Sequence, residues 1–109
     1  ERDPHVATLY LNIGTVYVDQ GQQELALQNY QKSLEIFTEK LGEKNPNVAT
    51  TYNNIGTMHF NQGNFAEALR CCELSLEIYT ATLGAQHPLT QQARDNVQDA
   101  REAAAEPGV

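Results

Sequence analysis

Apolar side chains recur at steps of three and four residues along most of the chain, the spacing that places them on one face of an α-helix. After the proline at position 4, the first stripe is Val6, Tyr10, Ile13 and Tyr17. A second stripe begins beyond the glycine at position 21, and it consists of Ala26, Tyr30, Leu34, Phe37 and Leu41. No alternating run of apolar and polar residues is long enough for a β-strand. The pattern therefore predicts an all-α protein.

The whole pattern returns after 42 residues. Pro4, Pro46 and Pro88 are each 42 residues apart, and the first 42-residue unit matches the second at 20 identical positions. Chance alignment gives only a few identities, so the sequence contains an internal duplication. The predicted units are a first repeat at 4–45, a second repeat at 46–87, a capping helix at 88–106 that is a partial third repeat, and a tail at 107–109.

Each unit is predicted to hold two helices, because start and stop signals recur within it. Asp3, Asn45 and His87 each precede a proline, and a capping side chain followed by proline is typical of a helix start. Glycines at equivalent positions then interrupt or end the helices, since glycine adopts the left-handed backbone conformation easily. The predicted breaks are Gly21 and Gly63, the second helices restart near Gln23 and Phe65, and the predicted C-terminal caps are Gly42 and Gly84.

The last segment, 88–106, combines a narrow apolar stripe with an otherwise polar surface. Such a helix can end a repeat stack, because one face packs on the previous repeat and the other meets solvent. Its apolar positions are Leu89, Ala93, Val97, Ala100 and Ala104.

Composition limits the possible partners. The chain has 109 residues, enough for one small domain, and its 40% hydrophobic content supports a folded core. Its formal net charge is −7, from 14 acidic and 7 basic side chains. Binding to a phosphate backbone needs clustered Lys and Arg, so the charge argues against nucleic acid and against an anionic membrane surface. No apolar run is long enough to span a bilayer. The chain starts without Met, and we expect it to be a piece of a longer protein.

The candidate reactive side chains form no catalytic or metal-binding pattern. Cys71 and Cys72 are neighbours, which disfavours a structural disulfide and indicates a reducing, cytoplasmic setting. We interpret Cys72 as a buried core residue and Cys71 as partly exposed. His5, His59 and His87 lack the spacing of a metal triad. We therefore expect no enzyme activity, no cofactor and no metal.

The repeated residues resemble the tetratricopeptide repeat (TPR) pattern of a bulky residue, an aliphatic-Gly pair, an aromatic, Ala, a second aromatic and a small residue. The matching residues of the first unit are Tyr10, Ile13, Gly14, Tyr17, Ala26, Tyr30 and Ser33. Those of the second unit are Tyr52, Ile55, Gly56, His59, Ala68, Cys72 and Ser75. A standard repeat of this family has 34 residues and closes with proline, whereas Thr38 and Thr80 stand there in this chain. The 42-residue form is similar to that of kinesin light chains and nephrocystin-3-like scaffolds. The resemblance covers residues 4–100 and implies an antiparallel helix-pair solenoid.

The resemblance also implies that the first helix of each repeat lines a concave groove that binds peptides. Asn12, Asn54 and Asn96 occupy the same place in successive units, and similar arrays hold an extended peptide with such an asparagine ladder. A side-chain amide both donates and accepts, so it can pair with any peptide bond. The alternative is that each amide satisfies a neighbouring backbone carbonyl or is simply solvated.

Neighbouring positions of the same helices complete the candidate site. Apolar members can contact a ligand side chain or pack between repeats, and acidic members suggest a basic or mixed peptide unless they only form a solvated face. The predicted peptide-binding residues besides the asparagine ladder are Leu11, Thr15, Val18, Asp19, Asn53, Thr57, Phe60 and Asn61. Further groove positions are Thr8, Thr50, Gln92, Asp95 and Asp99.

These observations lead to three functional hypotheses. The first is a protein-interaction module that binds an extended or partly helical peptide as part of a larger scaffold or adaptor. The second is an architectural segment of a larger array without a peptide ligand of its own. Two repeats and a cap leave an end face open, so this hypothesis includes self-association. The third is a non-catalytic portion of an enzyme or sensor.

Overall fold

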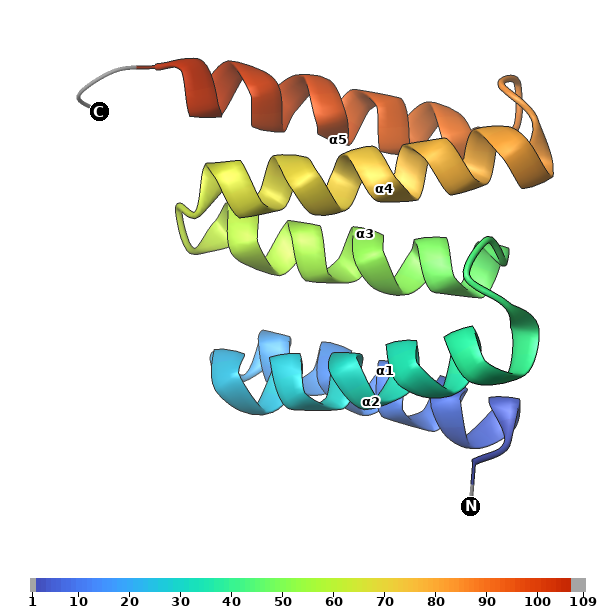
Figure 1. The fold of residues 1–109 in the computed structure, drawn as a ribbon. Helices are drawn as coiled ribbons and strands as arrows, with labels where there is room; N and C mark the ends of the chain where they lie inside the picture. The colour runs from blue at the N-terminus through green and yellow to red at the C-terminus, as the bar shows by residue number, and fades with distance from the viewer. Residues whose placement is uncertain (1, 107–109) are drawn as a thin grey trace.

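The computed structural model describes residues 2–106 and confirms the all-α class (Figure 1). Helices follow one another along the described chain, joined by short turns, and none of these residues lies in a strand. The helices are α1 (Pro4–Asp19), α2 (Gln23–Leu41), α3 (Pro46–Asn61), α4 (Phe65–Leu83) and α5 (Pro88–Ala105). The tail expected at 107–109 lies outside the described residues.

The helix starts are made by the side chains that the sequence indicated. Asp3, Asn45 and His87 each accept a hydrogen bond from the backbone N–H two residues further on, at 2.7, 2.8 and 3.1 Å. Proline is the first residue of α1, α3 and α5, where its missing N–H costs nothing. The caps satisfy donors that a helix N-terminus otherwise leaves unpaired, and they fix where each helix begins.

Glycine separates the two helices of each pair. Gly21 and Gly63 have φ angles of 77° and 84°, a conformation that other residues adopt only with strain. The turn lets α2 fold back against α1 and α4 fold back against α3. Because both turns have the same form, the two helix pairs have the same local geometry.

The helices form two layers with a core between them. The first helices α1, α3 and α5 contact one another in series, and α2 and α4 lie on the other side. The main core cluster takes residues from all five helices: Ala7, Ile36, Phe37, Val48, Ala49, Ile78, Tyr79 and Ala93. A smaller cluster joins α2, α3 and α4 through Ala26, Tyr30, Ile55, Met58 and Cys71. Each helix pair therefore depends on its neighbour for much of its buried surface.

One apolar stripe is covered in two units and uncovered in the first. Leu9, Ile13 and Val16 of α1 are 59%, 42% and 52% exposed. Their counterparts 42 and 84 residues later are all buried, and these are Thr51, Ile55, Met58, Ala93, Val97 and Ala100. The counterparts pack against the preceding helix pair, and no described residue precedes α1 in this way. We call Leu9, Ile13 and Val16 the uncovered α1 face. The prediction that Ile13 belongs to a buried stripe is wrong in this structure.

Three further members of the predicted stripes are exposed. Leu41 and Leu89 are 39% and 41% accessible, and Ala104 is also exposed. Each of them lies in the first or last turn of its helix. The prediction that Cys71 is partly exposed is also wrong, because the side chain is buried in the smaller core cluster.

Candidate functional site

The predicted asparagine ladder occupies the middle of three successive first helices. Asn12 lies on α1 and is exposed, whereas Asn54 on α3 and Asn96 on α5 are half-buried. Asn96 donates a hydrogen bond from Nδ2 to Oδ1 of Asn53, at 3.0 Å. One N–H of the third asparagine is thus used to join α5 to α3, and Asn53, also a predicted site residue, is its partner.

The threonines of the candidate site bond to their own helices. Thr15 Oγ1 donates to the carbonyl oxygen of Leu11 at 3.2 Å, and Thr57 Oγ1 donates to that of Asn53 at 3.0 Å. Thr15 Oγ1 also lies 3.1 Å from the hydroxyl oxygen of Tyr30, so these two hydroxyls share a hydrogen bond. The equivalent contact is missing at Thr57, because residue 72 is a cysteine where the first unit has Tyr30.

The apolar and terminal members of the site have different surroundings. Leu11 and Val18 are half-buried and pack against the core clusters. Both side chains therefore take part in packing between the repeats, the alternative to contact with a ligand. Asp19 and Asn61 are exposed at the last positions of α1 and α3. Phe60 is half-buried and meets the ring of Phe65 edge-on, with centroids 5.1 Å apart and an interplanar angle of 66°. Phe60 is therefore held in place by the start of α4.

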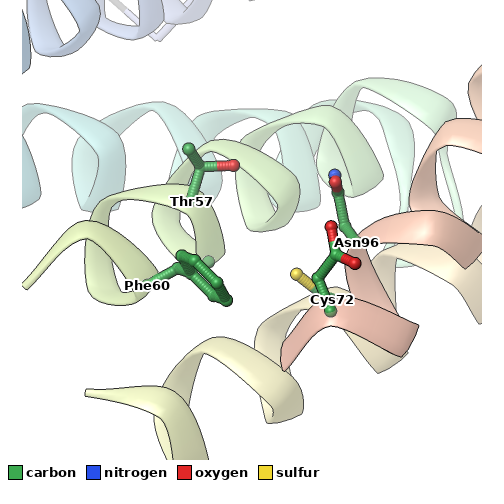
Figure 2. A pocket seen from close by; sticks show the side chains of 6 residues that line it. Thr57, Phe60, Cys72 and Asn96 are labelled. Atoms are coloured by element: carbon green, nitrogen blue, oxygen red, sulfur yellow. The ribbon is translucent and has the colours of Figure 1, made fainter. Parts of the chain in front are cut away.

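A pocket of about 120 Å³ lies where α3, α4 and α5 meet, and we call it the groove pocket. Figure 2 shows Phe60 and Asn96 on opposite sides of it, with the Cys72 sulfur between them. The pocket brings together three predicted site residues and the groove position Asp99 from two first helices. Its lining is Gly56, Thr57, Phe60, Cys72, Asn96 and Asp99. Leu11, Thr15, Val18, Asp19 and Asn61 do not line it, and neither do Asn12, Asn53 and Asn54.

Gly56 and Cys72 were not among the predicted site residues. The glycine allows α3 and α4 to approach closely, since a Cβ at position 56 would lie 2.9 Å from Cys72 Sγ and 3.2 Å from Cys71 Cβ. The signal that could have identified Cys72 is its register, because it replaces Tyr30 within a stretch that is otherwise strongly repeated. The register identifies Cys72 as a core residue, and its side chain is much smaller than that of Tyr30.

The two cysteines are poor nucleophiles. Burial, together with the nearby Cys71 and Glu73, raises the pKa of Cys72 to about 11. Burial also raises the pKa of Cys71 above its ordinary value, although Arg70 opposes the shift. Reactive cysteines have lowered pKa values and are accessible, so both thiols are protonated packing groups at neutral pH. Within residues 2–106, no cluster of three or more His, Cys, Asp or Glu side chains could hold a metal ion.

Several basic side chains pair with glutamates of the second helices. Arg2 bonds Glu35 and Glu39 of α2, at 3.2 and 2.7 Å. Arg70 pairs within α4, and Arg101 reaches from α5 to Glu73 of α4 at 3.4 Å. These cations compensate acids of α2 and α4, while Asp19, Asp95 and Asp99 are exposed on the first helices.

Taken together, the paired helices, the two-layer stack and the pocket between first helices define a helical-repeat protein. Two tetratricopeptide repeat family models match the sequence, over residues 5–68 and 48–89. The chain belongs to the tetratricopeptide repeat family, whose repeats are generally non-catalytic modules for protein–protein interaction. No helix of the described part has the length and apolar content needed to cross a membrane.

A solved structure agrees with this assignment and refines the type. The chain is similar to BtubC (BKLC) from P. vanneervenii, with 26% sequence identity and a TM-score of 0.89. The match covers 94% of this chain and 41% of that protein, so the chain spans less than half the length of its relative. The likeness supports the kinesin light chain-like type of repeat. A comparison with curated proteins finds no match.

Proposed function

We propose that the face formed by α1, α3 and α5 binds an extended or partly helical peptide of another protein, and that the chain does so within a larger scaffold or adaptor. The groove pocket carries this proposal, because α3 and α5 contribute four predicted groove positions to its lining: Thr57, Phe60, Asn96 and Asp99. The proposal keeps the division into repeats at 4–45 and 46–87 and a capping helix at 88–106. It also places the protein in the cytoplasm, and two buried free thiols support this setting.

Amides give this face its expected affinity for a peptide backbone, and carboxylates contribute to its expected selectivity. Asn12 and Asn54 are at equivalent positions of successive first helices, so one extended backbone can meet both amides. Asp19, Asp95 and Asp99 add exposed negative charge, which favours a peptide of basic or mixed character. The amides would supply affinity for any backbone, and the acids and the pocket would select side chains.

The test begins with a phage-displayed library of random peptides selected on the wild-type protein. Selected peptides are synthesised, and their dissociation constants are measured by calorimetry for the wild type, for Asn54→Ala and for the control Gln31→Ala. Gln31 is an exposed amide on α2, in the other layer. Loss of one hydrogen bond costs about 1 kcal/mol, so we expect Asn54→Ala to weaken binding roughly fivefold. Gln31→Ala should leave it unchanged. A library without binders, or equal affinity for Asn54→Ala, would overturn the proposal.

The uncovered α1 face favours a second candidate function, self-association with another copy. Its three apolar side chains are exposed where their counterparts in α3 and α5 are buried. Sedimentation equilibrium over a range of concentrations tests this candidate with Leu9→Asp and the control Leu41→Asp. Leu41 is also an exposed leucine, and it lies at the end of α2. Self-association predicts a dimer that Leu9→Asp dissolves and Leu41→Asp retains. A wild-type monomer at every concentration rejects the candidate.

A further inference from the structure

The groove pocket occupies the place that an aromatic ring fills in the first repeat. Gly14, Thr15 and Tyr30 correspond, at a distance of 42 residues, to Gly56, Thr57 and Cys72. The Tyr30 ring lies directly against Gly14, since a Cβ at position 14 would come within 2.7 Å of two ring carbons. The Tyr30 hydroxyl then reaches Thr15 Oγ1, as described above.

The second repeat keeps this frame and lacks the ring. Gly56 and Thr57 are both present, and Cys72 Sγ lies against the glycine as the Tyr30 ring does in the first repeat. Cysteine is much smaller than tyrosine, and the pocket is lined by these three residues together with three more. The empty space is therefore the counterpart of the space that the Tyr30 side chain fills from α2 in the first repeat. In the second repeat this space stays open between α3 and α5.

We propose that the groove pocket accepts a tyrosine side chain of the bound peptide. This inference rests on the proposed function and names the side chain that the site selects. An engineered cavity of roughly 150 Å³ holds a benzene molecule, so an open pocket of about 120 Å³ suits one six-membered ring. The incoming ring would lie on Gly56, contact the thiol of Cys72 and face Phe60. Sulfur and aromatic contacts of this kind are favourable.

The polar rim of the pocket selects among aromatic side chains. Asp99 presents a carboxylate and Thr57 a hydroxyl, and both can accept the proton of a neutral phenol. Hydrogen bonds to a charged acceptor are stronger than those between neutral groups, so tyrosine is favoured over phenylalanine. A phosphotyrosine carries between about −1.5 and −2 charges at pH 7 and would be repelled by Asp99. The expected order of affinity is tyrosine, phenylalanine and then phosphotyrosine.

The variant Cys72→Tyr fills the pocket with the residue that the first repeat already uses. We expect it to fold, because Gly56 and Thr57 provide the same surroundings as Gly14 and Thr15. Cys72→Ala is the opposite substitution at the same position, since it removes the thiol contact and leaves the pocket open. Tyrosine-containing peptides should bind Cys72→Tyr at least tenfold more weakly than wild type, and Cys72→Ala, which loses the sulfur contact alone, about threefold more weakly.

A small probe tests the pocket even when no peptide has been found. We would titrate p-cresol, the tyrosine side chain itself, into isotope-labelled protein and follow the Thr57 and Phe60 resonances by NMR. Wild type and Cys72→Ala should show saturable shifts at millimolar concentration, and Cys72→Tyr should show none. Equal shifts in all three proteins, or none in any, would overturn the inference. If Cys72→Tyr does not fold, the exposed Asp99→Asn replaces it and should reduce the preference for tyrosine over phenylalanine.

The peptide measurements separate this inference from the proposed function. Peptides that bind the wild type and keep their affinity for Cys72→Tyr would support the groove and overturn the tyrosine pocket. The same conclusion follows if replacing the tyrosine of a selected peptide by arginine raises its affinity. Saturable p-cresol shifts in a protein that selects no peptide would support the pocket and overturn peptide binding.

Discussion

The two isoleucines at equivalent positions of the repeats should differ sharply in their contribution to stability. Ile13 on α1 is 42% exposed, whereas Ile55 on α3 is 6% exposed and belongs to the smaller core cluster. Both side chains precede a glycine in the middle of a first helix, so helix propensity changes equally when each is replaced by alanine. The difference between Ile13→Ala and Ile55→Ala therefore measures only the covering of the side chain by neighbouring helices.

The magnitude follows from the burial of each site. Replacing a buried isoleucine by alanine costs about 2–5 kcal/mol, because apolar contacts are lost and a cavity remains. We expect about 3 kcal/mol for Ile55→Ala, whose neighbours Tyr30 and Met58 are fixed in the core. Ile13 borders solvent and leaves no closed cavity, so we expect about 1 kcal/mol. A difference of about 2 kcal/mol shifts the midpoint of thermal unfolding by roughly 8–16 °C in a domain of this size.

Urea denaturation followed by circular dichroism at 222 nm gives both values, at several protein concentrations. An unchanged m value, which is the slope of the unfolding free energy with urea concentration, would show that each variant has the same denatured state. Equal costs at all concentrations would refute the reasoning, since they would mean that α1 is as well covered as α3. Equal costs only at high concentration would show that a second copy covers the uncovered α1 face.

Three further outcomes test the local structure. His87→Asn should stabilise the protein by about 0.5 kcal/mol in calorimetry, because asparagine is among the best N-caps and already starts the equivalent α3; a lower midpoint would contradict the cap. Gly14→Ala gains about 1 kcal/mol of helix propensity but loses about 1–3 kcal/mol, because the new methyl group displaces the Tyr30 ring. Urea denaturation should therefore show a net loss of stability of about 1 kcal/mol. A net gain would be inconsistent with the close contact between Gly14 and Tyr30. The folded protein holds the Cys72 proton to a higher pH than the unfolded chain does. The free energy of unfolding should therefore fall between about pH 9 and pH 11, by up to about 1.4 kcal/mol per pH unit. Cys72→Ala should reduce this slope.

Local signals in the sequence were sufficient to predict the helices. A side chain such as Asp3 or Asn45 caps a helix through contacts within two residues of itself, and the following proline suits only the first helical turn. The break at Gly21 likewise depends on the preference of one residue for a positive φ. Such features need no knowledge of distant residues, and the described structure has the starts and breaks where the sequence placed them.

Burial depends on neighbours, and here the sequence was less informative. Ile13 and Ile55 have the same local sequence, and only the helix pair that precedes α3 distinguishes them. The groove pocket raises the same difficulty, since α3, α4 and α5 must be assembled before its lining is visible. The replacement of Tyr30 by Cys72 was nevertheless present in the alignment of the repeats. A loss of side-chain volume at equivalent packing positions of two repeats is thus a signal that can be searched for in the sequence alone.

The two repeats differ at a position that could select a side chain of the proposed peptide ligand. The amides at Asn12 and Asn54 are identical in the two units, so they would hold any peptide backbone and could not fix which residue of it lies where. Tyr30 and Cys72 are different, and the groove pocket of the second repeat opens against Cys72. A tyrosine in that pocket would set the register of the whole peptide, because its backbone would then meet the amide of Asn54 at a fixed distance from the anchored side chain. Affinity from repeated positions and register from a single unrepeated one would let a short array select a sequence without losing the stacking that keeps it folded.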